Sequence, residues 1–196
     1  MLLIHILLAV VVMVNVVLPP KEEFVIVKGS KITVQAATSL GNINCSYSSN
    51  SLKDTLLLNT ALLKKDRLKL SIPVEQFGCG NPLLNRDFQQ TLNAKEYPNI
   101  RIEVLSLKQA GKDYKGALKF EVGGKTTMME EVIFNMFSAQ GATFMKSNIC
   151  LNFTEMGLNA PKKLGGLFKV DEELQIIVEL QVSNKQALPF LTGSAI

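Results

Sequence analysis

Residues 174–182 read LQIIVELQV, with an apolar side chain at every second position. Leu174, Ile176, Val178, Leu180 and Val182 fall on one side of an extended chain, and the glutamines and the glutamate fall on the other. A period of two is typical of a β-strand with one apolar face and one face in water. This stretch therefore predicts a strand that covers an apolar interior.

The same alternation recurs through most of the chain from residue 31 onward. Segments 31–36, 67–75, 100–104 and 118–122 show it clearly, whereas 127–138 and 143–153 are more mixed. Glycines fall between these segments, which is typical of hairpin turns and short loops. About eight strands with hairpin links favour an antiparallel barrel or sandwich.

One segment departs from the period of two. Asn81 suits a helix N-cap, Pro82 suits the first helical position, and apolar side chains follow at positions 84, 88 and 92. The helix should end before Tyr97-Pro98, because the residue before a proline is pushed out of the helical region. A single short helix cannot cover an extended sheet, so we expect the sheet to close into a barrel and remove its exposed edges.

The first twenty residues differ from the rest of the chain. They contain no charged side chain, and the apolar run over residues 2–18 predicts a membrane-inserting segment. Seventeen helical residues rise about 25 Å, which suits either the apolar region of a signal peptide or a short membrane anchor. We therefore expect residues 1–20 to be a leader or anchor, residues 30–184 to form the barrel domain, and residues 185–196 to be a C-terminal tail.

Length, composition and charge limit the classes of function. With 196 residues, 47% of them hydrophobic and 19% charged, the chain should form one domain with a buried core. Its net charge of +4 is mild, and its lysine pairs are short. These features exclude a strong nucleic-acid interface.

The cysteine pattern excludes the common metal and redox motifs. Cys45, Cys79 and Cys150 are too far apart for a Cys-x-x-Cys motif or a zinc knuckle, so we expect no metal site. In an oxidising compartment we expect Cys45 and Cys79 to pair, and closing that loop would add about 3–4 kcal/mol of stability. Cys150 lies in a strand-like stretch, where a lone cysteine is expected to be a small buried hydrophobe.

The residues of the expected barrel do not form a known catalytic group. The single histidine is His5, in the N-terminal apolar run, so a Ser-His or Cys-His pair cannot form in the barrel. The acidic pairs are adjacent residues, which face opposite ways on a strand and cannot act as carboxylate dyads. We therefore expect a protein that is not an enzyme and that needs no cofactor.

Several short motifs occur in an order that resembles the YceI-like family, the bacterial lipid- or polyisoprenoid-binding proteins. The resemblance covers residues 30–184 and rests on Leu40 to Cys45, Cys79-Gly80-Asn81, Asn85-Arg86-Asp87-Phe88, Lys95 to Ile100, Tyr114 to Phe120, and Phe153 to Gly157. The first two of these motifs resemble a subgroup with one cysteine on an early strand and another before the helix. That subgroup supports the pairing of Cys45 with Cys79.

The resemblance implies a lipocalin-like barrel, exported to the periplasm or cell envelope, whose lumen holds a long-chain isoprenoid or another amphiphilic lipid. Burial of each methylene of such a chain gains about 0.8 kcal/mol, so a long apolar tunnel needs few polar contacts. On this basis we predict that nine inward-facing side chains line the lumen: Ile72, Val74, Ile102, Val104, Leu118, Phe120, Phe134, Ile176 and Val178.

A second interpretation remains open at this point. The barrel could be filled by its own side chains and act as a structural or interaction domain, tethered to the membrane through residues 2–18. Both interpretations are compatible with a homodimer. The volume of the lumen separates them, because a continuous cavity of several hundred Å³ favours a lipid ligand.

Overall fold

The computed structural model describes residues 23–39, 41–58, 60–61, 67–160 and 170–187. The predicted N-terminal leader or anchor, residues 1–20, lies outside the described residues, as do residues 188–196 of the predicted tail. The elements in chain order are β1 (Glu23–Thr38), β2 (Gly41–Ser49), β3 (Asp54–Leu58), β4 (Thr60–Ala61), β5 (Lys69–Pro73), η2 (Val74–Gln76), α1 (Pro82–Thr91), β6 (Asn99–Ala110), β7 (Asp113–Val122), β8 (Lys125–Ala139), β9 (Ala142–Asn152), β10 (Val170–Val182) and β11 (Gln186–Ala187).

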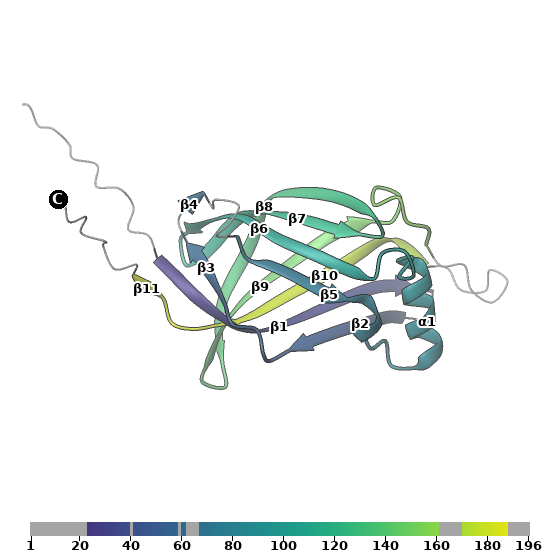
Figure 1. Ribbon diagram of the computed structural model, residues 1–196, viewed down its shortest axis with the longest axis horizontal. Coiled ribbons are helices and arrows are strands. Elements are labelled where there is room, and N and C mark those ends of the chain that lie inside the picture. Colours follow the sequence, from purple (N-terminus) through teal and green to yellow (C-terminus); the bar gives the residue numbers. More distant parts are fainter. Residues whose placement is uncertain (1–22, 40, 59, 62–66, 161–169, 188–196) are drawn as a thin grey trace, which may run out of the picture.

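The strands form one antiparallel sheet that curls into a barrel (Figure 1). Its path runs from β1 through β10, β9, β8 and β7 to β6. The short strands β3 and β4, one residue apart in the chain, then connect the two edges, because β3 pairs with β1 and β4 pairs with β6. The predicted all-β antiparallel barrel with one helix is therefore confirmed, although short segments raise the number of described strands from the predicted eight to eleven.

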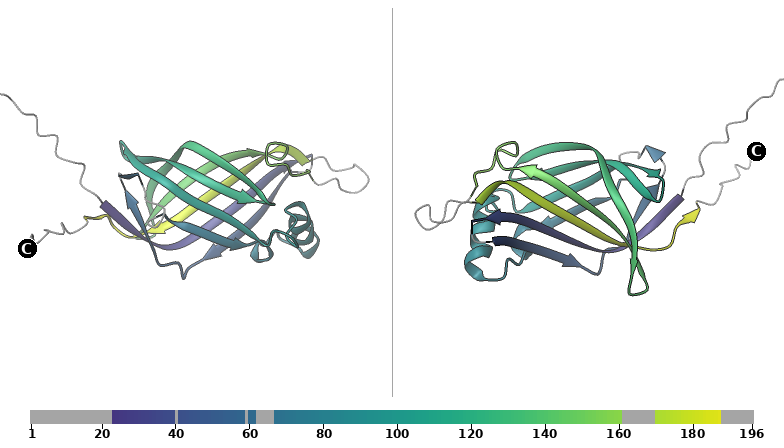
Figure 2. Two further views of the ribbon diagram at one scale, coloured as in Figure 1. Left: turned by 45° about the horizontal axis from the view of Figure 1, so that its top comes forward. Right: turned by 180° about the vertical axis from the view of Figure 1, so that it is seen from behind.

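The two ends of the barrel differ (Figure 2). At one end, α1 lies beside the β1–β2 turn. At the other end, β1 begins at Glu23 and pairs with β11 at Ala187, so the first and last described strands are neighbours. The β8–β9 hairpin also projects at this second end.

The predicted alternation determines which side chains are buried. In β7, Tyr114, Gly116, Leu118, Phe120 and Val122 face the interior, and the residues between them are more exposed. β10 follows the same rule over residues 174–182. The interior is therefore built from the apolar positions of the period-two pattern.

Helix α1 begins and ends where the sequence predicts. Asn81 is the N-cap, and its side-chain oxygen accepts a hydrogen bond from the backbone N–H of Leu84 at 2.9 Å. Pro82 occupies the first helical position, where its missing N–H has no consequence. Phe88 then faces the barrel and contacts Phe77, with ring centroids 5.1 Å apart.

A disulfide joins Cys45 in β2 to Cys79, which precedes α1. Beside it, Ser46 and Gly78 exchange two backbone hydrogen bonds of 2.9 Å. These links connect β2 to the segment between η2 and α1, and they hold the helix against the barrel. The predicted pairing of Cys45 with Cys79 is confirmed.

The expected burial of Cys150 is wrong. Its side chain is exposed, because Ile149 and Leu151 on either side face the interior, and the alternation turns Cys150 outward. The pKa of the Cys150 thiol is raised, mainly because the sulfur is partly buried and secondly because of a hydrogen bond with Glu173.

Among the described residues, no helix has the length and apolar character needed to cross a bilayer.

Candidate functional site

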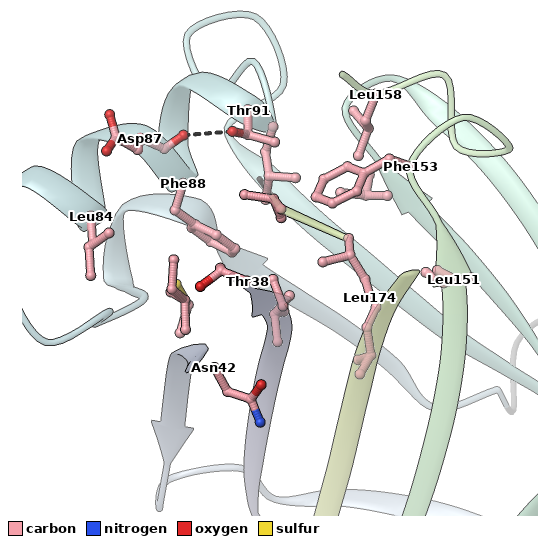
Figure 3. A pocket seen from close by; sticks show the side chains of 18 of the residues that line it. Thr38, Asn42, Leu84, Asp87, Phe88, Thr91, Leu151, Phe153, Leu158 and Leu174 are labelled. Atoms are coloured by element: carbon pink, nitrogen blue, oxygen red, sulfur yellow. Dashed lines mark hydrogen bonds between the residues drawn. The ribbon is translucent and has the colours of Figure 1, made fainter. Parts of the chain in front are cut away.

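The described residues enclose a cavity of about 580 Å³ at the α1 end of the barrel. Helix α1, the end of β1, the start of β2 and residues 153–158, which follow β9, lie around it (Figure 3). It extends inward to Phe120 on β7 and Ile176 on β10. The cavity therefore occupies one part of the barrel interior.

Most of the cavity wall is apolar. Aliphatic, aromatic and sulfur-containing side chains from seven elements and their connections contribute to it: Val34, Ala36, Ile43, Cys45, Leu83, Leu84, Phe88, Leu92, Ile100, Phe120, Val122, Leu151, Phe153, Met156, Leu158, Val170, Leu174 and Ile176. The polar residues of the wall come mainly from α1 and the β1–β2 turn: Thr38, Asn42, Asn81, Asp87 and Thr91. Such a cavity suits an apolar ligand that needs few hydrogen bonds.

The position of each side chain follows from its element. Strand alternation in β1 turns Val34, Ala36 and Thr38 to the cavity side. On α1, residues 84, 88 and 91 share one helical face, and Figure 3 shows Leu84 and Phe88 pointing from the helix toward Thr38 and Asn42. Leu174 and Phe153 lie across the cavity from α1.

The cavity wall carries one ionisable side chain among the described residues, Asp87, which is 8% exposed. Figure 3 shows its carboxylate pointing away from Phe153 and Leu174. Its backbone carbonyl accepts a hydrogen bond from Thr91 Oγ1 at 2.8 Å. No lysine, arginine or histidine is among the described residues of the wall.

The geometry of the described residues does not assemble catalytic groups at the cavity. They contain no cluster of three or more His, Cys, Asp or Glu that could hold a metal ion. Hydrogen bonds from the backbone N–H of Met136 and from Asn135 lower the pKa of Asp113, and partial burial raises that of Cys150, but both groups lie outside the cavity wall.

All nine side chains that the sequence assigns to the lumen lie in the buried interior. Phe120 and Ile176 also line the cavity. The other seven lie outside its wall and pack within the core: Ile72, Val74, Ile102, Val104, Leu118, Phe134 and Val178. Contact of any of the nine with a ligand stays a prediction.

The sequence assigns none of the α1 side chains to the cavity, although Leu84 and Phe88 form one of its walls. A signal was present, because the apolar stripe of this helix has to pack against other apolar groups. The residues of the β9–β10 connection, such as Leu158, carry no comparable signal because they follow no regular period.

No protein-family model matches the chain, and no curated protein matches it in sequence. Among solved structures, the chain is similar to a polyisoprenoid-binding domain from Saccharophagus degradans implicated in plant cell wall breakdown, with a TM-score of 0.58 and 12% identity over 82% of this chain and 97% of that one. BcnA of Burkholderia cenocepacia gives a TM-score of 0.49 and 15% identity over 83% of this chain and 96% of that one. The YCEI protein of Campylobacter jejuni gives a TM-score of 0.46 and 12% identity over 59% of this chain and 70% of that one. The predicted resemblance to the YceI-like family is confirmed at the level of the fold.

Proposed function

We propose that this protein binds the apolar chain of an isoprenoid-type or other long-chain amphiphilic lipid in the cavity beneath α1, and that it carries or stores this lipid without converting it. The observation that carries the proposal is the cavity itself, whose volume is about 580 Å³ and whose wall is mostly apolar. This volume lies within the range of about 300–1,000 Å³ that is usual for small-molecule sites.

The energetics favour a chain over a compact polar ligand. Each methylene that moves from water into an apolar wall gains about 0.8 kcal/mol. The polar residues of the wall come mainly from α1 and the β1–β2 turn, so a lipid head group would find hydrogen-bond partners such as Asn42 and Thr91 there. The similarity to a polyisoprenoid-binding domain supports an isoprenoid chain as the first class to test.

The proposed location is the periplasm or cell envelope. The apolar run over residues 2–18 would direct export, either as a cleaved signal peptide or as an anchor. The disulfide between Cys45 and Cys79 supports this location, because disulfides persist in oxidising compartments.

A second candidate function is a structural or interaction barrel. The packing of the opposite part of the interior favours it, since Leu107, Tyr114, Leu118 and Met145 are almost fully buried and lie outside the cavity wall. On this alternative, the cavity beneath α1 would stay without a lipid.

A cavity-filling variant distinguishes the two candidates. Ala36 lines the cavity, whereas Ala37 is the next residue of β1 and faces the other way. Ala36→Trp should therefore abolish lipid retention, and Ala37→Trp should leave it unchanged. Each protein would be purified from a bacterial envelope and extracted, and the extract analysed by mass spectrometry. Equal lipid content in the two variants, or no lipid in the unmodified protein, would favour the structural barrel.

A further inference from the structure

An exposed leucine lies at the edge of the cavity. Leu83, Met128 and Ile133 each expose 56% of their surface, and of these three large apolar side chains only Leu83 lines the cavity. Leu83 sits in the first turn of α1 and is therefore in contact with both the cavity and the solvent. A ligand chain that passes over Leu83 on its way from the solvent to the cavity would be in contact with an apolar side chain.

A cation accompanies this leucine. Arg86 follows Leu83 by three residues, so the two side chains are neighbours on the helix surface. Arg86 is exposed and forms no ion pair with a described residue. The first turn of α1 carries no acidic side chain. Leu83, at the edge of the cavity, thus has a basic neighbour on the helix surface.

We propose that the α1 end of the barrel docks on a bilayer that contains anionic phospholipid, and that lipid enters and leaves the cavity over Leu83. This inference rests on the proposed lipid-binding function. In this arrangement Leu83 inserts at the boundary of head groups and acyl chains, as apolar side chains of interfacial helices do. The Arg86 guanidinium, whose planar donors match a phosphate group, binds a lipid phosphate.

Two matched pairs of variants test the docking. Leu83→Glu is compared with Ile133→Glu, because Ile133 is equally exposed but does not line the cavity. Arg86→Gln is compared with Lys108→Gln, because Lys108 is an exposed cation near the far end of β6. Each pair makes the same change of charge at the cavity edge and away from it.

Two measurements separate docking from binding. The first is the equilibrium affinity for a fluorescent geranylgeranyl ester added without vesicles. The second is the rate at which the protein extracts this ester from phosphatidylcholine vesicles with and without phosphatidylglycerol.

Leu83→Glu should slow extraction about tenfold and lower the equilibrium affinity by a clearly smaller factor, since it removes insertion into the interface and changes only one side chain at the edge of the wall. Arg86→Gln should slow extraction about fivefold, which corresponds to about 1 kcal/mol per basic residue near an anionic surface, and only from vesicles with phosphatidylglycerol. This effect should disappear at high salt. Ile133→Glu and Lys108→Gln should behave like the unmodified protein.

Equal extraction rates for Leu83→Glu and Ile133→Glu would overturn the docking proposal. A loss of affinity in Leu83→Glu as large as its loss of rate would also overturn it, because Leu83 would then act as part of the cavity wall alone. Absence of equilibrium binding by the unmodified protein would instead overturn the proposed function, and this inference with it.

Discussion

The disulfide between Cys45 and Cys79 joins two parts of the barrel wall where β2 and β5 share no ladder of backbone hydrogen bonds among the described residues. The covalent link and the single Ser46–Gly78 bridge hold the wall together there. Because Cys45 also lines the cavity, this link supports the site as well as the fold.

Removal of the disulfide should lower the stability of the protein. The bond closes a loop with a sequence separation of 34 residues. The double variant Cys45→Ala/Cys79→Ala should lose about 3–4 kcal/mol of unfolding free energy on the chain-entropy model. Urea denaturation under non-reducing conditions measures this difference. Equal midpoints for the variant and the unmodified protein would contradict the prediction, and reductant should shift only the unmodified protein.

One of the three cysteines should carry a free thiol, and the other two should form a disulfide. The sequence has three cysteines, and the disulfide leaves Cys150 free. Titration of the denatured, unreduced protein with a thiol reagent should find one thiol, which Cys150→Ser removes. In the folded protein this thiol should react slowly at neutral pH, because its raised pKa keeps it protonated. Rapid reaction of folded protein would contradict this expectation.

Gly116 should not tolerate a side chain. A Cβ at this position would lie 2.2 Å from the backbone oxygen of Ser106 on the neighbouring strand. Gly116→Ala should therefore lower the unfolding free energy by about 1–3 kcal/mol, since β6 and β7 must move apart. Gly78→Ala is the control, because a Cβ there meets no atom within 4 Å. Thermal unfolding of both variants checks the prediction, and equal losses at the two glycines would contradict it.

The carboxylate of Asp113 should make stability depend on pH in the acid range. Hydrogen bonds from the backbone N–H of Met136 and from the Asn135 side chain, each 3.0 Å long, lower its pKa. A carboxyl with a lowered folded pKa adds stability above its unfolded pKa, and that stability is lost as the pH falls through the folded value. Asp113→Asn should thus be less stable than the unmodified protein at neutral pH, and the difference should vanish in strong acid. Urea midpoints between pH 2 and 7 measure this difference, with Asp171→Asn as an exposed control. A difference that is constant over this range would show that the charge of Asp113 has no role.

The sequence allowed much of the fold to be predicted, because its two strongest signals are local. Alternation determines which side chains of β7 and β10 face inward, and Asn81-Pro82 determines where α1 begins. β3 was not predicted from the pattern, because Leu56, Leu57 and Leu58 are consecutive and show no period of two. The alternation of Ile149, Cys150 and Leu151 indicates that the Cys150 side chain faces outward. Its burial was expected because lone cysteines are usually buried, and this general tendency was given more weight than the local pattern.

The candidate site could be predicted only in part. Alternation shows that Val104 and Phe120 both face the interior, but it does not show which of them meets another side chain and which meets open space. That difference depends on where α1 and residues 153–158 after β9 lie at the end of the barrel. Such long-range placement is not encoded in the spacing of residues along one strand.

The pairing of Glu23 in β1 with Ala187 in β11 has a practical consequence. Both described ends of the chain lie at the end of the barrel away from α1. A reporter domain, an affinity tag or a solid support joined directly at Glu23 or at Ala187 would therefore lie at the end of the barrel opposite the cavity. Molecules immobilised in this way would all present the α1 end of the barrel to a sample.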